Sequence, residues 1–183
     1  MDELILTKTA IEIGEIKNVN NKILKKHCLK YKHYIGRDRG KDITDTLSED
    51  SDIPTHPELE KMLNNINEQY FSKYKNNLIL DQFWGHIHDK NHSTNLHHHA
   101  TVNNLEKSPQ VSGVYYVSVP KDAGVIVFQY PINQYVSNRY WIQPREGLFI
   151  LFPSTLEHFV TRNKNTKERI SISFNFHVHS IRK

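Results

Sequence analysis

The chain has 183 residues, a formal net charge of +4, a hydrophobic share of 37% and a single cysteine, Cys28. These values fit one globular domain with a substantial core, exclude an internal disulfide and favour a reducing compartment. No apolar run approaches the roughly 20 residues that span a bilayer, and the N-terminal residues do not resemble a secretion signal, so we expect a cytoplasmic protein without a membrane partner.

The first part of the chain predicts mixed secondary structure. Residues 3–16 carry β-branched side chains in partial alternation and predict one or two strands, and residues 18–34 predict a helix. The lysines of that helix fit a solvated face, and without an aromatic ladder or a known motif we expect no nucleic-acid partner. Residues 35–56 predict a long loop. Pro57 then opens a second helix that reaches about Tyr74, and its apolar stripe is Leu59, Met62, Leu63, Ile66, Tyr70 and Phe71.

From residue 78 the sequence favours short strands separated by turns. The segments are apolar or alternating and rich in Val, Ile, Phe and Tyr; they are residues 78–88, 111–119, 124–130, 139–143, 147–152 and 168–178. This pattern predicts an antiparallel sandwich or barrel. We therefore expect an N-terminal α/β support region over residues 1–77, packed on a barrel over residues 78–183, as one folding unit.

Histidines in the second half indicate a metal site. Residues 97–99 are all histidine, and because side chains alternate on an extended chain, His97 and His99 face the same way. Two imidazoles placed like this can bind one ion, and a third ligand must come from elsewhere. The best candidate is His158, which follows an apolar strand at residues 148–152.

A strictly alternating segment begins eleven residues after His158. Arg169, Ser171, Ser173 and Asn175 share one face, while Ile170, Ile172, Phe174 and Phe176 share the other. In a barrel one of these faces is interior. An interior arginine needs an anion, and a small dicarboxylate would satisfy it because guanidinium and carboxylate pair through two parallel hydrogen bonds.

These motifs together resemble those of the 2-oxoglutarate/Fe(II) oxygenases. The chain is most similar to a prolyl-hydroxylase-like group found in marine bacteria and their phages. The matching pieces are Asn95-x-His97-x-His99, residues 112–117, Pro144-x-x-Gly147, Phe152-Pro153-Ser154-x-x-x-His158 and residues 169–175. The resemblance implies an α+β fold, namely a double-stranded β-helix (jelly-roll) barrel with N-terminal helices packed on it, in a bacterial or phage-encoded protein.

The resemblance also implies an activity and its residues. The expected cofactors are Fe(II) and 2-oxoglutarate, and the expected partners are O2 and a small-molecule or protein substrate that is hydroxylated. His97 and His158 match the iron-binding histidines of the family. Arg169 and Ser171 match the residues that bind the far carboxylate of 2-oxoglutarate. Tyr116 matches a tyrosine of the prolyl-hydroxylase branch that reaches the same carboxylate, and Tyr115 is its outward-facing neighbour.

The chain departs from the family at the second iron ligand. The usual ligand is a carboxylate, which completes a site of two histidines and one acid, but this position holds His99. Three readings remain open. The site can work with His97, His99 and His158; a loop carboxylate such as Asp89 or Glu106 can complete it; or the barrel has lost catalysis and serves as a binding module. A three-histidine cupin-type oxygenase that needs no 2-oxoglutarate is a further alternative.

Other residues have two readings as well. His86 and His88 form a second His-x-His motif, either as an alternative metal pair or as ordinary histidines of the pocket wall. His177 and His179 continue the Arg169 face and fit structural or rim positions. Arg169 itself can instead form a buried salt bridge. Neither the substrate nor the oligomeric state is encoded in these motifs.

Overall fold

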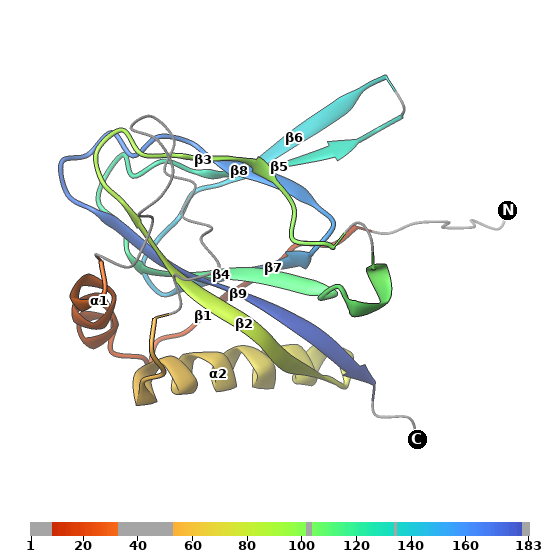
Figure 1. The fold of residues 1–183 in the computed structure, drawn as a ribbon, viewed down its shortest axis with the longest axis horizontal. Helices are drawn as coiled ribbons and strands as arrows, with labels where there is room; N and C mark the ends of the chain where they lie inside the picture. Colours follow the sequence, from red (N-terminus) through yellow and green to blue (C-terminus); the bar gives the residue numbers. More distant parts are fainter. Residues whose placement is uncertain (1–8, 33–52, 102–103, 134, 181–183) are drawn as a thin grey trace, which may run out of the picture.

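The computed structural model describes residues 9–32, 53–101, 104–133 and 135–180. Two antiparallel sheets face one another and form a double-stranded β-helix (Figure 1). The five-stranded sheet has the order β1-β7-β4-β9-β2 and the four-stranded sheet has the order β3-β8-β5-β6. The strands are β1 (Glu12–Glu15), β2 (Asn76–His88), β3 (Thr94–His97), β4 (Val111–Ser118), β5 (Ile126–Pro131), β6 (Ser137–Ile142), β7 (Leu148–Pro153), β8 (Glu157–Val160) and β9 (Arg169–Ser180).

Two helices complete the α+β fold on the outer side of the larger sheet. They are α1 (Asn21–Lys30) and α2 (Pro57–Tyr74), and a short 3-10 turn, η1 (Leu105–Lys107), precedes β4. The predicted bounds of α2 are confirmed. Pro57 is its first residue, His56 accepts a hydrogen bond from the amide of Glu58, and Lys75 ends the helix in the left-handed conformation (φ 59°). No helix in the described ranges is long and apolar enough to cross a bilayer.

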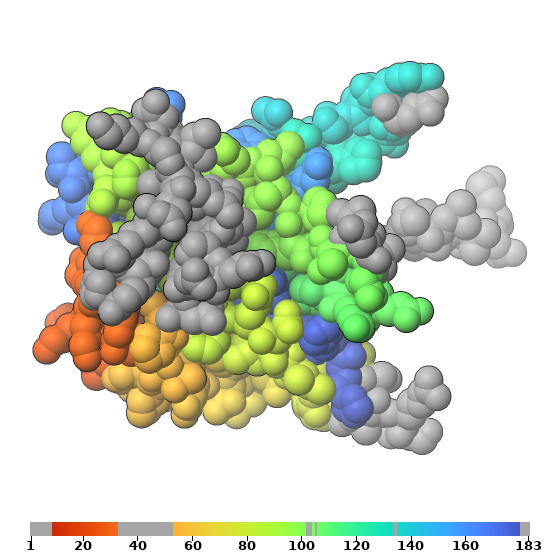
Figure 2. All heavy atoms as spheres, in the orientation of Figure 1, coloured from red at the N-terminus to blue at the C-terminus, as the bar shows by residue number. Residues whose placement is uncertain are grey.

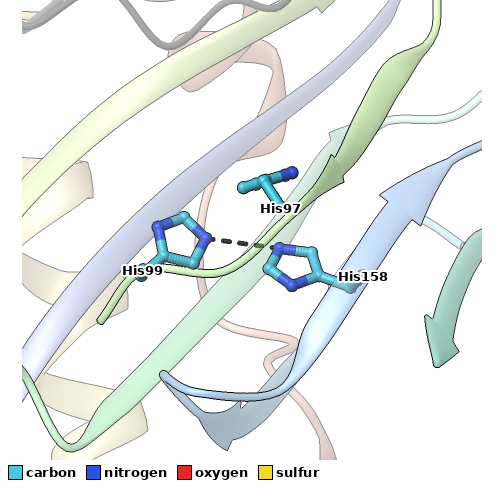
Figure 3. A group of neighbouring side chains, drawn as sticks. All are labelled: His97, His99 and His158. Carbon is cyan, nitrogen blue, oxygen red and sulfur yellow. Dashed lines mark hydrogen bonds between the residues drawn. The ribbon is translucent and has the colours of Figure 1, made fainter. Parts of the chain in front are cut away.

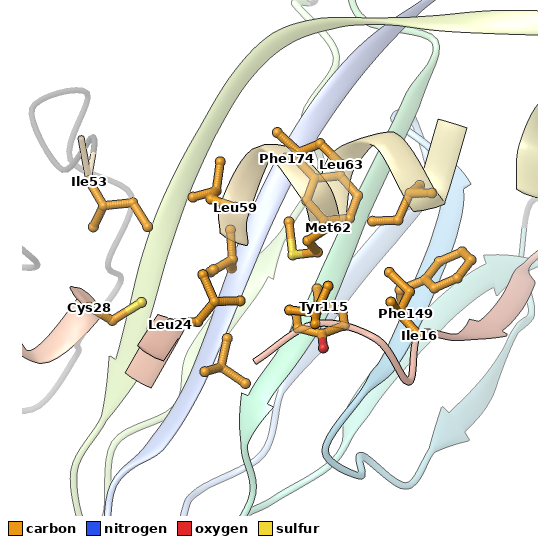
Figure 4. Close-up of a cluster of buried hydrophobic side chains, with 14 of the residues drawn as sticks. Ile16, Leu24, Cys28, Ile53, Leu59, Met62, Leu63, Tyr115, Phe149 and Phe174 are labelled. Atoms are coloured by element: carbon orange, nitrogen blue, oxygen red, sulfur yellow. The ribbon is translucent and has the colours of Figure 1, made fainter. Parts of the chain in front are cut away.

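The alternation of β9 separates two cores. Its apolar face, including Ile170, Ile172 and Phe174, packs with Leu59 and Met62 of α2 on the outer side of the sheet (Figure 4). Its polar face, with Arg169 at the start of the strand, looks into the space between the sheets. A second cluster of apolar side chains fills the rest of that space; it comprises Val114, Tyr116, Ile126, Phe128, Ile142, Leu148, Ile150, Phe152, Leu156 and Val160. The space between the sheets therefore contains this apolar cluster and the polar face of β9.

Gly113 brings β4, β7 and β9 close together. A Cβ atom at this position would lie 2.3 Å from Phe174 and 2.7 Å from the carbonyl oxygen of Ile150. Only glycine leaves room for both neighbours, so Gly113 is a close-packing residue in the middle of the larger sheet.

Some elements differ from the expectation. The strand signal over residues 3–16 corresponds to the four residues of β1, and residues 1–8 lie outside the described ranges. Most of the predicted loop over residues 35–56 also lies outside them. The strands β3 and β8 were not predicted as strands, because each has only four residues and together they carry Thr94, Asn95, His97, Glu157 and His158. They form because they pair with each other and β8 also pairs with β5.

Candidate active site

The three candidate metal ligands converge at one end of the barrel. His97 ends β3 and lies directly opposite His158 of β8, so both side chains face the interior. His99 follows β3, and its amide donates a hydrogen bond to the carbonyl oxygen of Ser154 (2.8 Å). One nitrogen from each ring lies within 4.8 Å of the others (Figure 3). This arrangement can hold a metal ion.

The backbone fixes which nitrogen of each ring faces the centre. The Nδ1–H of His97 donates to the carbonyl oxygen of Asn95 (2.7 Å), and the Nδ1–H of His158 donates to that of Leu156 (2.9 Å). The lone pair of each ring is therefore on Nε2, as is usual for histidine ligands whose other nitrogen is held by a second partner. The Nε2 atoms of His99 and His158 are 3.2 Å apart. Two nitrogen ligands about 2.1 Å from one ion and at a right angle would be roughly 3 Å apart.

Two of these imidazoles, those of His99 and His158, are neutral at physiological pH. Burial, with neighbouring histidines, lowers the pKa of His99 to about 2 and that of His158 to about 3. Metal ions bind neutral imidazole, so no proton has to be displaced from a charged ring before a metal can bind. The residues present thus fit a divalent first-row ion.

No carboxylate joins the three histidines among the described residues. Asp89 forms an ion pair with Lys32 (2.7 Å), and Glu106 is exposed on η1. His98, between the two converging histidines, is exposed and faces away, as alternation predicts. The loop-carboxylate reading therefore has no support in the described ranges.

A cavity of about 400 Å³, its open mouth included, extends from the three histidines into the barrel. Both sheets contribute to its wall. The lining residues are His86, His88, Thr94, His97, His99, Gly113, Val114, Ile126, Phe152, His158, Val160, Arg169, Ser171 and Ser173.

Arg169 lies in this cavity as a buried cation. It is 1% exposed, and among the described residues no ion pair involves it, so the salt-bridge alternative is not supported. Its Nε has no hydrogen-bond partner, and neither has the hydroxyl of the buried Tyr116, whose ring lies 5.2 Å from the guanidinium carbon. Burial lowers the pKa of Arg169 and raises that of Tyr116. Unpaired buried donors of this kind are costly, and an anion would satisfy them.

Neighbours of Arg169 come from its own strand, β9, and from the adjacent strand β4. Ser171 is buried, lines the cavity and lies opposite Tyr116 across β4 and β9. Tyr115, on the other face of β4, packs in the core under the helices and donates a hydrogen bond to Asn21 (2.8 Å). The sequence therefore assigned the two tyrosines to the correct faces.

Two further histidines line the cavity on β2. His86 and His88 lie opposite Ser171 and Arg169, and their rings stack with centroids 5.8 Å apart. The indole N–H of Trp84 donates to Nε2 of His86 (2.8 Å). They are pocket-wall histidines and not part of the metal cluster. Trp84 and Thr94 were not identified from the sequence. Trp84 could have been found because it alternates with His86 on β2, and Thr94 because it lies shortly before His97.

His177 and His179 lie farther along β9 than the cavity. His177 is 3.6 Å from Asp81, and neither histidine lines the cavity around the metal cluster. This location agrees with a rim or structural position.

The fold has close counterparts among proteins of known structure. The chain is similar to a prolyl-4-hydroxylase from Pseudomonas putida (13% identity, 92% of each chain covered, TM-score 0.63). It is also similar to a prolyl hydroxylase from Trichoplax adhaerens that was solved with a peptide of hypoxia inducible factor (13% identity, 91% and 83% covered, TM-score 0.59). A non-haem α-ketoglutarate-dependent carbocyclase from nogalamycin biosynthesis is similar as well (10% identity, 92% and 79% covered, TM-score 0.65). At these identities the likeness shows the fold alone.

The sequence itself supplies the family. No curated protein matches the chain. Residues 82–175, slightly more than half of the chain, match the family described as "Putative 2OG-Fe(II) oxygenase". This match includes every residue of the three-histidine cluster, together with Tyr116, Arg169 and Ser171. The chain therefore belongs to the 2OG-Fe(II) oxygenase family of enzymes.

Proposed function

We propose that this chain is an Fe(II)- and 2-oxoglutarate-dependent dioxygenase that hydroxylates a protein or amino-acid side chain. One observation carries the proposal. Arg169, a buried cation whose Nε has no hydrogen-bond partner, shares a cavity with three converging histidines. A metal site alone would not need Arg169, and an anion site alone would not need the histidines. A ligand that is both a metal chelator and a dianion explains the two together.

Each residue has a distinct role in this proposal. His97, His99 and His158 would hold Fe(II) from one side, leaving the side toward the cavity for 2-oxoglutarate and O2. Arg169, with Ser171 and Tyr116, would bind the far carboxylate and so orient the keto acid toward the metal. Iron bound there would supply the oxidation of a C–H bond to an alcohol by O2, with 2-oxoglutarate converted to succinate and CO2. The apolar walls, including Phe152 and Val160, would keep water from the reacting groups.

The histidine in place of an acid changes the charge of the site. Three neutral ligands leave the full charge of a divalent ion in the cavity, and Arg169 adds another positive charge. Bound 2-oxoglutarate, a dianion, would offset most of this charge. The proposed site thus depends on its cosubstrate for charge balance more than a site with a carboxylate ligand would.

The projecting hairpin formed by β5 and β6 favours an extended substrate such as a polypeptide. The strands β5 and β6 continue beyond the rest of the barrel (Figures 1 and 2). Register places His97, His158, Phe128 and Tyr140 in one row across the smaller sheet, so all four face the interior side. Tyr140 is 54% exposed at the end of this row. An aromatic ring at that place suits a polypeptide segment lying outside the cavity, with one side chain directed toward the metal.

An anaerobic titration tests the proposal. Fe(II) is added first, then 2-oxoglutarate, and the weak visible charge-transfer band of the iron chelate is followed. We expect a saturating band that N-oxalylglycine, an unreactive mimic, competes away. Fe(II) binding without the band would favour a three-histidine oxygenase that needs no 2-oxoglutarate. Failure to bind Fe(II) would favour a binding module and overturn the proposal.

A further inference from the structure

Arg169 is held in the cavity by a histidine and not by an acid. His88 of β2 lies opposite Arg169 of β9, and the guanidinium Nη1 donates a long hydrogen bond to Nδ1 of His88 (3.5 Å). The other ring nitrogen of His88, Nε2, lies 2.9 Å from Oγ1 of Thr94. All three side chains are buried. The chain Thr94–His88–Arg169 therefore connects β3, β2 and β9 at the inner end of the cavity.

The hydrogen-bonding capacities fix the tautomer of His88. A guanidinium has donors only, so Nδ1 of His88 must present its lone pair to Arg169. The ring proton is then on Nε2 and is donated to Thr94. The ring cannot take a second proton without turning an N–H toward the cation, and burial together with Arg169 lowers its pKa well below the usual value. Stacking on His86, which Trp84 holds through a hydrogen bond, further fixes the plane of the ring.

Because His88 is a neutral hydrogen-bond acceptor, it affects the charge of Arg169 differently from a carboxylate. A carboxylate beside Arg169 would neutralise the guanidinium and repel an incoming dicarboxylate. Imidazole orients the guanidinium and leaves its charge uncompensated. Nε of Arg169 stays unpaired, and among the described residues no acid forms an ion pair with it.

We propose that His88, fixed by Thr94, is the positioning residue of the cosubstrate site: it aims Arg169 into the cavity while leaving its charge for a dicarboxylate. This inference rests on the proposed function, since it assumes that Arg169 binds the far carboxylate of 2-oxoglutarate. It assigns His88 no contact with iron or with the reacting atoms.

A matched pair of variants tests the charge argument. His88→Asn places an amide oxygen near the position of Nδ1, and His88→Asp places a carboxylate of the same shape there. Two probes are titrated against the anaerobic Fe(II) protein, namely 2-oxoglutarate and 2-oxopentanoate, which has the same chain length but lacks the far carboxylate. Fe(II) affinity and melting temperature are measured for every variant as controls for the metal site and the fold.

We expect a result that a merely structural role would not produce. The affinity of His88→Asn for 2-oxoglutarate should lie within about threefold of the parent's. His88→Asp should bind 2-oxoglutarate at least about 30-fold more weakly, because the new carboxylate forms an ion pair with the guanidinium of Arg169. Binding of 2-oxopentanoate should differ little between the two variants. Equal 2-oxoglutarate affinity of the Asn and Asp variants would overturn the inference.

Thr94 gives a second pair in case a change at His88 prevents folding. Thr94→Ser keeps the hydroxyl acceptor, and Thr94→Val removes it, which leaves the buried Nε2–H of His88 unpaired and allows the opposite tautomer. The Val variant should bind 2-oxoglutarate about tenfold more weakly than the Ser variant, again with little change for 2-oxopentanoate. Equal 2-oxoglutarate binding by these two variants would overturn the positioning role of Thr94 and His88 and would leave the proposed function intact. A parent protein that binds Fe(II) but not 2-oxoglutarate would instead overturn the proposed function.

Discussion

The Nε2 atoms of His99 and His158 lie 3.2 Å apart where β3 ends and β8 begins. Because Nδ1–H of His158 is donated to the backbone, its Nε2 accepts, and His99 must donate from Nε2 when no metal is present. A bound metal would need lone pairs from both atoms. Metal binding would then move the proton of His99 to its other nitrogen, while His158 would keep its tautomer.

Replacing His99 with the acid that the family normally uses tests the three-histidine site. His99→Asp should still bind Fe(II), because a carboxylate can complete the set. Carboxylate favours Mn(II) and imidazole favours Zn(II) and Cu(II), so the variant should shift the ratio of Mn(II) to Zn(II) affinity toward Mn(II) by about tenfold or more. Isothermal titration with each metal measures the shift. An unchanged ratio of affinities would mean that His99 is not a ligand. His99→Ala, which has no ligand at this position, provides the reference.

The run of three histidines contains its own control. His97→Ala and His158→Ala should each weaken Fe(II) binding at least about 100-fold, since each removes one of three ligands. His98→Ala should leave binding unchanged, because His98 is exposed on the opposite face. The melting temperature of the metal-free variants should change by no more than a few degrees, as expected for functional polar residues. Similar losses in all three variants would contradict the assigned geometry.

The strands and helices that the sequence predicted are those with a strong local pattern. The Pro57 start and apolar stripe of α2 gave its bounds, and the alternation of β9 gave its two faces. The strands β3 and β8, which carry His97 and His158, have no such pattern. Each is only four residues long, and its conformation comes from pairing with strands distant in sequence. Local propensity contains little information about such pairing.

The same limit applies to the site. Alternation and motif order were enough to predict that His97, His99, His158 and Arg169 lie around one cavity. The contact between Arg169 and His88 depends on the register of β2 against β9, which also contains an irregularity between Leu80 and Gln82. A shift of one residue would turn His88 away from the cavity, and no signal in the sequence fixes that register.

The buried histidines predict an acid-sensitive fold. Burial and the charge of Arg169 lower the pKa of His86 to about 3, whereas an unfolded histidine titrates near 6.5. The unfolded state therefore binds the proton first as pH falls. The stability associated with His86 is fully present above about pH 6.5 and is lost as pH drops toward 3, by about 1.4 kcal/mol per pH unit. Urea unfolding of the metal-free protein between pH 7 and pH 5 measures this slope. His86→Gln, which keeps an acceptor for Trp84, should reduce the slope by that amount; an unchanged slope would show that folding does not lower the pKa of His86.

The row formed by His97, His158, Phe128 and Tyr140 across the smaller sheet predicts different roles for two adjacent aromatic residues of β6. Tyr140 lies on the interior side of β6, next to Phe128, while Trp141 lies on the outer side, next to Val127. Both are exposed, at 54% and 66%. If the substrate passes over the interior side, Tyr140→Ala should lower the succinate formation that a peptide library stimulates by about tenfold, and Trp141→Ala should not. Binding of Fe(II) and 2-oxoglutarate should be unchanged in both variants. Equal effects of the two changes would place the substrate elsewhere.

Arg169 distinguishes a 2-oxoglutarate enzyme from other metal-binding barrels. Removing one partner of a buried, hydrogen-bonded charge pair costs on the order of 3–5 kcal/mol, and each 1.4 kcal/mol is about a factor of ten. Arg169→Ala should therefore weaken binding of 2-oxoglutarate at least about 100-fold. Fe(II) binding should barely change, because Arg169 is not a ligand.

The remaining Arg169 variant separates charge from geometry. Arg169→Lys should recover part of the affinity, since the charge remains while the two-pronged pairing with a carboxylate is lost. Competition with N-oxalylglycine measures both variants under the same anaerobic conditions. An Ala variant that binds the mimic as tightly as the parent would show that Arg169 does not bind the far carboxylate. The unpaired Nε of Arg169 and hydroxyl of Tyr116 would then need another anion, and binding of succinate, sulfate or phosphate in the absence of metal would identify its class.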